Sequence, residues 1–324
     1  MVRVAVTGGT GTVGAALVRH LVAEGHQVNA LARTGVGSDA LELAGAQPVA
    51  GDVLDSPSLD RLVDRTEMVF HVAGINQLCP KDPGEMWRVN VDGTREVLEA
   101  CRRAGVRRLV HTSSAVTIGE EDGNVGSEAT THRGNYLSQY ERTKTEAEAL
   151  ALAGGGEVEV VSVNPSSVQG PGRSTGTGRI LLRAVQGRLP IAMDTIFSLV
   201  DIDDCARGHL LAAERGRPGE RYLLSGVTLT TREAVSILAA VTGVRPRVRY
   251  LRPGVLSALG PVVGAIYGMI GRHAPVCPEA VRVLQHGHRY DGSRATRELG
   301  LTYTRVEETL RRTVEWFRSQ GMVS

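Results

Sequence analysis

The chain has 324 residues, of which 42% are hydrophobic and 22% are charged, so it is long enough to form one or two domains around a substantial core. This composition excludes a disordered tail and a small disulfide-stapled domain. The 37 basic and 35 acidic side chains leave a formal charge of +2, which gives no reason to expect a nucleic-acid partner. Charge is divided unevenly, because residues 1–169 carry a net charge of −7 and residues 170–324 a net charge of +9.

The four cysteines (79, 101, 205 and 277) lie far apart and form no C-x-x-C pair. This spacing predicts neither a disulfide framework nor a metal site, and it fits a reducing cytoplasm. The first strand-like residues run directly into glycines without the features of a signal peptide, so we expect a cytoplasmic protein. The uncharged run 255–271 contains four glycines and Pro261 and is short for a membrane span. We interpret it as buried helices and expect no membrane contact.

Short runs rich in Val and Ala alternate with longer helical patterns through the first half of the chain. The pattern predicts strands over 2–6, 26–31, 47–51, 67–72, 107–112 and 157–163, and helices over 12–24, 37–45, 57–64, 84–104 and 138–153. Alternation of this kind predicts a doubly wound parallel sheet with helices on both faces, which is an α/β fold of the Rossmann type.

After Pro165 the alternation loosens, which predicts a dinucleotide-binding domain over 1–165 and a smaller substrate-binding α+β domain over 166–324. Some segments of this second part are expected to return to the large sheet. A glycine-rich stretch over 170–178 comes first. It is followed by predicted helices near 179–187, 203–215, 231–242, 277–285 and 305–319, and by short strands near 189–200, 221–225 and 246–250.

The first predicted strand ends in the glycine-rich turn TGGTGTVG, residues 7–14. The turn satisfies both a GxGxxG frame from Gly9 and a GxxGxxG frame from Gly8. In either frame the glycines allow a pyrophosphate to approach backbone N–H groups at the positive end of the following helix. The turn therefore predicts a dinucleotide site, whose candidate contacts are Gly8, Thr10, Gly11, Thr12 and Val13.

The ends of the next three strands supply further candidates for the cofactor site. Arg33 stands where dinucleotide folds select the ribose, and its guanidinium would attract a 2′-phosphate, which favours NADP(H) over NAD(H) unless Arg33 is a solvated strand-end charge. Asp52 could accept from the adenine amino group, or it could belong to the turn before the next helix. The small residues Ala73 and Gly74 would let the backbone run beside the cofactor.

A tyrosine and a lysine, Tyr140 and Lys144, share one face of the predicted helix 138–153, because residues four positions apart lie next to each other. A neighbouring ammonium favours the phenolate, so the pair is a credible acid–base device. Ser114, after the fifth strand, could hydrogen bond a substrate oxygen, although a polar strand end is the simpler interpretation. His71 and His111 receive no role.

These residues resemble the extended short-chain dehydrogenase/reductases of the NAD-dependent epimerase/dehydratase superfamily. The resemblance spans nearly the whole chain and includes the glycine turn, the Tyr140/Lys144 pair and the segments 51–53, 71–74, 89–94, 112–114 and 164–171. It implies a catalytic triad of Ser114, Tyr140 and Lys144. It also implies a structural asparagine at Asn90, nicotinamide-facing residues at Pro165, Ser167 and Val168, and further cofactor contacts at Val53 and Thr112.

Arg33, the Thr-Ser-Ser strand end and the C-terminal segment 290–317 are most similar to the dihydroflavonol-reductase and 3β-hydroxysteroid-dehydrogenase-like branch. The sequence departs from the pattern of this branch at two places, which leaves the identity of the substrate and of the cofactor open. Gln169 stands where many members have tyrosine, and Ala32-Arg33-Thr34 replaces the commoner Arg-Asp-Pro. The superfamily resemblance also implies a homodimer formed by the helices 84–104 and 138–153.

The leading hypothesis is hydride transfer between NADP(H) and a ketone or secondary alcohol of a largely apolar small molecule, with Tyr140 exchanging the proton. The alternative is a nucleotide-sugar epimerase or dehydratase that retains NAD, whose diphosphate substrate would need arginines such as Arg173, Arg179, Arg183 or Arg249. The apolar run 255–271 speaks against the alternative, because it suggests an apolar cover for an uncharged substrate. A nucleotide-binding protein without turnover would not need Tyr140 and Lys144 together.

Overall fold

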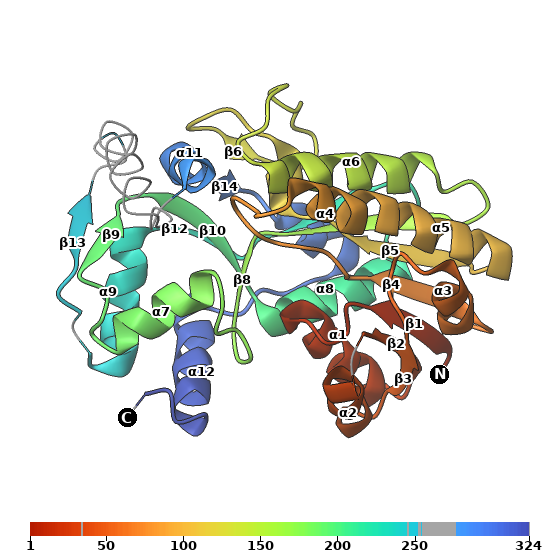
Figure 1. Ribbon diagram of the computed structural model, residues 1–324. Coiled ribbons are helices and arrows are strands. Elements are labelled where there is room, and N and C mark those ends of the chain that lie inside the picture. Colours follow the sequence, from red (N-terminus) through yellow and green to blue (C-terminus); the bar gives the residue numbers. More distant parts are fainter. Residues whose placement is uncertain (34, 245, 252–253, 255–276, 324) are drawn as a thin grey trace.

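The structure is a computed structural model that describes residues 1–33, 35–244, 246–251, 254 and 277–323. A parallel seven-stranded sheet in the order β11-β7-β5-β4-β1-β2-β3 forms the larger part of the molecule (Figure 1). This sheet, flanked by helices, confirms the predicted Rossmann-type α/β fold. Its strands are β1 (Arg3–Thr7), β2 (Gln27–Ala32), β3 (Gln47–Ala50), β4 (Met68–His71), β5 (Arg108–Thr112), β7 (Glu159–Pro165) and β11 (Arg221–Leu224).

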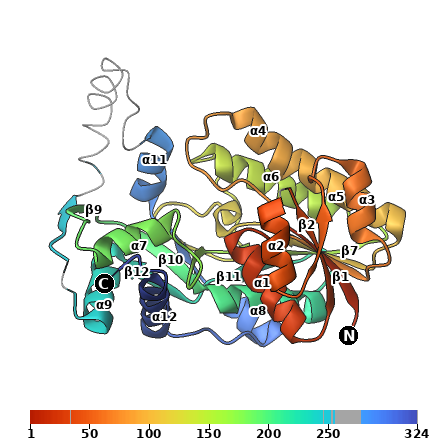
Figure 2. The same cartoon turned by 60° about the horizontal axis from the view of Figure 1, so that its bottom comes forward.

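Helices cover both faces of the sheet, as Figure 2 shows. Alternation along β1 explains the two layers, since Val4 and Val6 belong to one buried cluster and Ala5 to the other. The first cluster includes residues of α1 (Thr12–Ala23), α2 (Gly35–Leu43) and α8 (Ile202–Arg215). The second includes residues of α3 (Ser56–Val63), α5 (Gly93–Ala104) and α6 (Gln139–Ala153).

The predicted helix 84–104 is divided into α4 (Pro83–Trp87), a π-helical turn η1 (Arg88–Asp92) and α5. Asn90 lies in the π-helical turn, where its carbonyl accepts from the Thr94 hydroxyl at 2.6 Å. Its side chain bonds to neighbouring segments instead of facing solvent. Hydrophobic periodicity does not predict a local irregularity of this kind or the side chain that it places.

The smaller part of the molecule has its own core. A three-stranded sheet contains β8 (Ser167–Gln169), β10 (Ile196–Asp201) and β12 (Val227–Thr230). Apolar residues of β10 and β12 pack with those of α7 (Thr177–Val185), α9 (Thr231–Thr242) and α12 (Val306–Ser319). The region predicted as strand over 189–200 contains two strands, β9 (Ile191–Met193) and β10. Shorter elements are η2 (Ala115–Ile118), β6 (Val125–Gly126), β13 (Arg249–Leu251), α11 (Pro278–His286), β14 (Arg289–Tyr290) and η3 (Ala295–Leu299).

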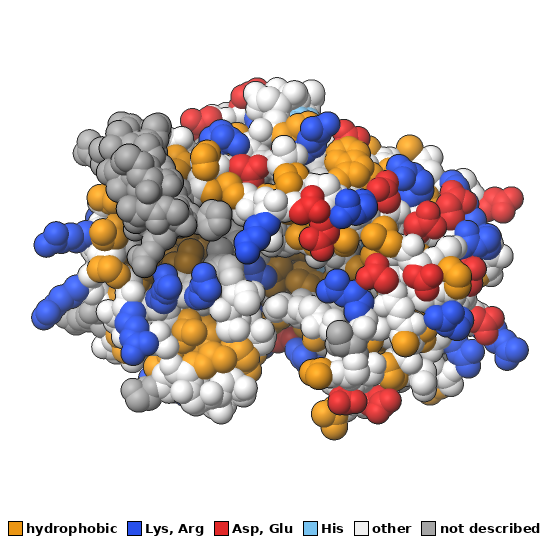
Figure 3. All heavy atoms as spheres, viewed as in Figure 1, with side chains coloured by type: hydrophobic (Ala, Val, Ile, Leu, Met, Phe, Trp, Pro, Cys, Tyr) orange, Lys and Arg blue, Asp and Glu red, His pale blue; other side chains and the backbone are white. Residues whose placement is uncertain are grey.

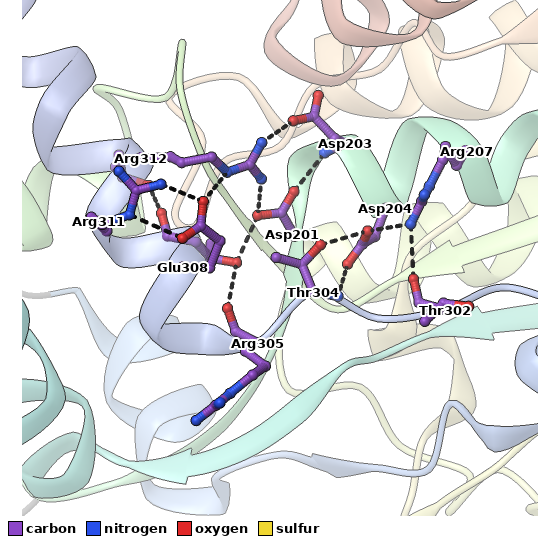
Figure 4. A network of polar contacts seen from close by, with 12 residues as sticks. Asp201, Asp203, Asp204, Arg207, Thr302, Thr304, Arg305, Glu308, Arg311 and Arg312 are labelled. Carbon is purple, nitrogen blue, oxygen red and sulfur yellow. Dashed lines mark hydrogen bonds and ion pairs between the residues drawn. The ribbon is translucent and has the colours of Figure 1, made fainter.

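A polar network joins the two parts where β10 runs into α8 (Figure 4). Asp201 caps α8 by accepting from the Asp203 backbone at 2.8 Å, and its carboxylate also binds Arg312 of α12 at 2.6 Å. Arg312 reaches Asp203 as well, at 2.5 Å. Asp204 accepts from the backbone and the hydroxyl of Thr304. The acidic segment therefore joins the C-terminal helix to the start of α8, which packs against the large sheet.

A disulfide bond joins Cys79 to Cys277, whose Cα atoms lie 6.3 Å apart. This corrects the expectation that the chain forms no disulfide. The two cysteines are 198 residues apart, and only the folded chain brings the loop after β4 beside the start of α11. No helix among the described residues is long and apolar enough to cross a membrane. The run 255–271, predicted as buried helices, lies outside the described residues.

Candidate active site

The glycine-rich turn between β1 and α1 packs too tightly for any side chain. A Cβ on Gly8, whose φ is +71°, would lie 2.5 Å from the Ala73 nitrogen, and one on Gly14 would lie 2.1 Å from the Gly8 carbonyl oxygen. The Gly11 nitrogen donates to that same carbonyl at 2.9 Å. Gly8, Gly11 and Gly14 therefore form the working frame of the turn.

The positive end of α1 is available to an anion. Gly11 caps the helix without a side-chain hydrogen bond, and the first turn contains no acidic residue. Free N–H groups at a helix N-terminus bind phosphate, so the turn fits the pyrophosphate of a dinucleotide. The candidate contacts Thr10, Thr12 and Val13 lie in this same turn.

The residues expected to bind the adenosine end of the cofactor follow β2 and β3, at the same edge of the sheet as the glycine-rich turn. Arg33 directly follows β2 and is exposed, and among the described residues it has no hydrogen-bond or ion-pair partner. Asp52 follows β3, and one of its carboxylate oxygens accepts from the Leu54 nitrogen at 3.0 Å. This bond supports the interpretation of Asp52 as a turn residue and leaves its second oxygen open. Val53 is buried against α5.

The residues after β4 lie between the glycine turn and α6. Ala73 donates its N–H to the Thr7 hydroxyl at 3.2 Å. A Cβ on Gly74 would lie 3.1 Å from the Asn90 side-chain oxygen and 4.0 Å from the Lys144 Nζ. Asn90 accepts from the Ile75 nitrogen at 2.7 Å and donates to Thr143 of α6 at 3.0 Å. Asn90 is thus a positioning residue that fixes this loop to α6.

Tyr140 and Lys144 lie in the first turns of α6, which begins with a capping bond from the Glu141 nitrogen to Ser138 at 3.1 Å. Lys144 is buried, and its Nζ donates to the Thr112 carbonyl at 2.7 Å. Burial lowers the pKa of Lys144 to about 8, although the Glu148 charge opposes this shift. Burial raises the pKa of Tyr140, against the lowering effects of Ser114 and of the Arg173 charge.

Ser114 is buried directly after β5, and its interaction with the Tyr140 phenol brings the three predicted catalytic residues together. Each residue comes from the carboxyl end of a strand or from the start of the next helix, which is where doubly wound folds bind ligands. The face shown in Figure 3 is hollowed between the two parts of the chain, with hydrophobic side chains recessed in it.

The candidates for the nicotinamide end lie where β7 passes into β8. Pro165 ends β7, and the Ser166 nitrogen donates to the Leu224 carbonyl of β11 at 2.9 Å. The Ser167 hydroxyl lies 3.2 Å from the Thr177 hydroxyl, and Val168 is buried. The buried Ser166 hydroxyl has no partner among the described residues.

Two residues near the site escaped prediction from the sequence, and a third was named for another role. Glu148, one turn after Lys144, accepts from Thr117 at 3.1 Å and from Asn164. Glu279 of α11 accepts from the Gln139 nitrogen at 3.1 Å and so fixes the start of α6. A third residue, Arg173, was named only for a diphosphate, although its charge acts on Tyr140. Spacing could have indicated only Glu148, which is four residues after Lys144.

His71 and His111, which received no catalytic role, are fully enclosed. Burial lowers the pKa of His71 to about 3, and the nearby Lys144 charge adds to this effect. The pKa of His111 is likewise held well below its usual range by burial and by Lys144. Both imidazoles are therefore neutral at physiological pH. The Thr7 hydroxyl lies 2.7 Å from one nitrogen of His71.

The chain is similar in sequence to known proteins over nearly its whole length. The chain is similar to a putative dihydroflavonol 4-reductase from Synechocystis sp., with 34% identity over 98% of this chain and 95% of the relative. It is 30% identical to the 2-alkyl-3-oxoalkanoate reductase of Stenotrophomonas maltophilia, over 96% of this chain and 98% of the relative.

Two solved structures are similar along their whole length. The first, gox2253, matches with a TM-score of 0.88 and 29% identity over 100% of both chains. The second, MoeE5 in complex with UDP-glucuronic acid and NAD, matches with a TM-score of 0.77 and 29% identity over 98% of this chain and 99% of its own. The sequence model described as the NAD dependent epimerase/dehydratase family matches residues 4–225. The chain therefore belongs to the NAD-dependent epimerase/dehydratase family of extended short-chain dehydrogenase/reductases.

Proposed function

We propose that the protein transfers a hydride between NADP(H) and a ketone or secondary alcohol of a largely apolar small molecule. The observation that carries this proposal is the grouping of Ser114, Tyr140 and Lys144 at the sheet edge beside the uncapped glycine turn. The relatives named as a putative dihydroflavonol 4-reductase and a 2-alkyl-3-oxoalkanoate reductase support a reductase. The exposed Arg33 after β2 supports NADP(H) over NAD(H).

The nicotinamide cofactor supplies or accepts the hydride when it is bound. In the reductive direction Ser114 hydrogen bonds the carbonyl oxygen, and Tyr140 donates a proton to it. Because burial raises the pKa of Tyr140, the phenol keeps its proton at neutral pH and is ready to donate it. Lys144 presents a buried ammonium one helical turn from Tyr140, where it can bind a ribose hydroxyl and stabilise the phenolate that forms.

Epimerisation of a nucleotide sugar with retained NAD is the second candidate. The match to MoeE5, solved with UDP-glucuronic acid and NAD, favours it. Three of the arginines that a diphosphate would need, Arg179, Arg183 and Arg249, are exposed at the surface. Solvated guanidinium groups bind a ligand diphosphate only weakly, so the structure offers less to this substrate than the sequence suggested.

A substrate panel separates the two functions. Hydrophobic ketones and nucleotide sugars are supplied with NADPH and with NAD at low and high salt, and cofactor consumption and product are measured. We expect NADPH to be consumed with hydrophobic ketones, with a KM that varies little with salt, because apolar contacts are not screened. Activity confined to nucleotide sugars, without net NADPH consumption and with a salt-sensitive KM, would establish the epimerase instead.

A further inference from the structure

A group of two histidines and one glutamate lies where the end of α11 meets the segment after η2. Glu120 comes two residues after η2, His286 ends α11, and His288 directly precedes β14. One ligand atom from each of these side chains lies within 4.8 Å of the other two. Together they form the Glu120 cluster. In the described part of the chain, no other three His, Cys, Asp or Glu side chains are arranged in this way.

Direct hydrogen bonds hold only part of the Glu120 cluster together. The His288 Nδ1 is hydrogen bonded to the Glu120 Oε1 at 2.7 Å, but the His286 Nε2 lies 3.6 Å from that oxygen, too far for a hydrogen bond. The His286 Nε2 and the Glu120 Oε2 are enclosed, and neither has a hydrogen-bond partner among the described residues. Buried polar atoms are normally paired, so an ion pair with His288 alone leaves the cluster incomplete.

Protein encloses the cluster and gives it polar walls. Side-chain exposure is 1% for Glu120, 8% for His286 and 13% for His288. The Tyr290 hydroxyl lies 3.0 Å from the His288 Nδ1, so a further oxygen atom borders the cluster. Arg133 donates to the Glu120 carbonyl at 3.2 Å, but its charge is paired with a different carboxylate, in α6. The Glu120 carboxylate is therefore left to the two histidines and to a cation.

We propose that the Glu120 cluster is a zinc site that fixes the end of α11 to the segment after η2. Imidazole nitrogens and carboxylate oxygens are ordinary zinc ligands, and three protein ligands leave the fourth position of a tetrahedral ion to water. Cysteine spacing predicts no metal site, and this site contains no cysteine. The four cysteines are either buried or disulfide-bonded, so no exposed thiol competes for the ion.

The distances within the cluster are close to those that zinc requires. Zinc binds nitrogen and oxygen ligands at about 2.0–2.2 Å, so ligand atoms of a tetrahedral site lie about 3.3–3.5 Å apart. The 3.6 Å between the His286 Nε2 and the Glu120 Oε1 is close to this spacing. The 2.7 Å bond to His288 would have to open by less than about 1 Å, and zinc would replace the proton held between the two atoms.

The position of the cluster gives the ion a structural role. The first end of α11 is joined to the loop after β4 by the Cys79–Cys277 disulfide, and Glu279 bonds it to the start of α6. Zinc would fix the other end, where β14 follows and pairs with β6 (Figure 1). Glu120 and His288 are 168 residues apart in the chain. A bond between such distant segments should raise the resistance of the protein to unfolding.

Zinc binding is measured by titration calorimetry on the 324-residue chain without an affinity tag, after EDTA treatment and in a buffer without thiols, which keeps the disulfide intact. We expect the wild type to bind one zinc ion per chain at this site. His286→Gln and Glu120→Gln each remove one ligand and should weaken binding at least about tenfold. The matched control is His26→Gln, because His26 lies 3.9 Å from Glu24 with no third ligand among the described residues, and its affinity should be unchanged.

Two further measurements report on the ligands and on the structural role. Cobalt(II), used in place of zinc, absorbs visible light when nitrogen and oxygen ligands hold it in a four-coordinate site. This absorption should appear with the wild type and with His26→Gln and be lost in His286→Gln. Saturating zinc should raise the Tm of the wild type by roughly 3 °C or more, and that of Glu120→Gln by less than about 1 °C.

Two results would overturn the site: no zinc binding by the wild type, or equal affinity in the wild type, His286→Gln and Glu120→Gln. Zinc binding without a rise in Tm would overturn the structural role. Circular dichroism without zinc shows whether each variant is folded, and if one is not, the other provides the comparison. None of these measurements requires turnover, so the result is independent of the proposed ketone reduction.

Discussion

Replacing Lys144 with methionine separates what this residue contributes to catalysis from its effect on stability. Lys144 is 5% exposed, and burial lowers its pKa from 10.5 to about 8. The unfolded chain therefore binds this proton more tightly than the folded chain does. As a result, the charged side chain opposes folding at every pH below about 8, and its unfavourable contribution fades as the pH rises from about 8 to 10.5.

The expected change in the free energy of unfolding follows from the pKa shift of Lys144 and from the one hydrogen bond that its ammonium donates. The lowered pKa corresponds to roughly 3 kcal/mol against folding at pH 7. The bond from the Lys144 ammonium to the Thr112 carbonyl, at 2.7 Å, offsets roughly 1.5–3 kcal/mol of this. Methionine has a similar volume and removes both effects. We expect Lys144→Met to raise the free energy of unfolding at pH 7 by roughly 0–1.5 kcal/mol while hydride transfer falls at least about 100-fold.

Urea unfolding without cofactor at pH 7 and pH 9.5, with hydride transfer measured on the same preparations, tests both expectations. The unfolding free energy of the variant relative to wild type should fall by roughly 2 kcal/mol between these pH values, because folded Lys144 is then largely neutral. The second lysine of the chain, Lys81, is exposed, and Lys81→Met is the matched control, with changes below about 0.5 kcal/mol. A loss of more than about 2 kcal/mol at pH 7 would refute the argument.

Three further outcomes are expected. Tyr140→Phe deletes the phenol oxygen alone and should reduce single-turnover hydride transfer by roughly 10²- to 10⁴-fold, with NADPH affinity by fluorescence titration near wild type; an unchanged rate would end the assignment. Arg33→Ala should weaken NADPH binding by roughly 1.5–3 kcal/mol and barely affect NADH, whereas equal losses would show that Arg33 does not contact the 2′-phosphate. A twofold dimer through α5 and α6 should appear in light scattering as twice the chain mass, and a concentration-independent mass of one chain would exclude it. Leu98 of α5 is buried in the protomer core and cannot contribute to this interface, whereas Ala149 of α6 is exposed and can.

The large sheet could be predicted because its strands and helices alternate with clear hydrophobic periods, and most predicted bounds lie within a few residues of those found. The strand predicted at 221–225 forms β11, but nothing local showed that it pairs with β7 at the sheet edge. The pair β6 and β14 has two residues in each strand, too few for a period. The Cys79–Cys277 bond depends on the folded position of α11.

The residues of the candidate site likewise include some that the sequence could predict and some that it could not. Spacing and strand ends indicate Gly8, Ser114, Tyr140 and Lys144, since each obeys a local rule. The contact of Glu279 with the start of α6 joins residues 140 positions apart, and no local pattern carries that information. The sequence names Arg173 among several arginines. Only the packing of the glycine-rich loop distinguishes it from the exposed members of that group.

The two cations of the site are compensated differently, and the difference has a mechanistic consequence. Lys144 has Glu148 as a nearby negative charge, and that carboxylate is itself held by Thr117 and Asn164. Arg173 has no such partner among the described residues, and its charge lowers the pKa of Tyr140 against the effect of burial. Any anion that binds near Arg173 would weaken this lowering effect, so the pKa of Tyr140 would depend on the charge of the bound ligand.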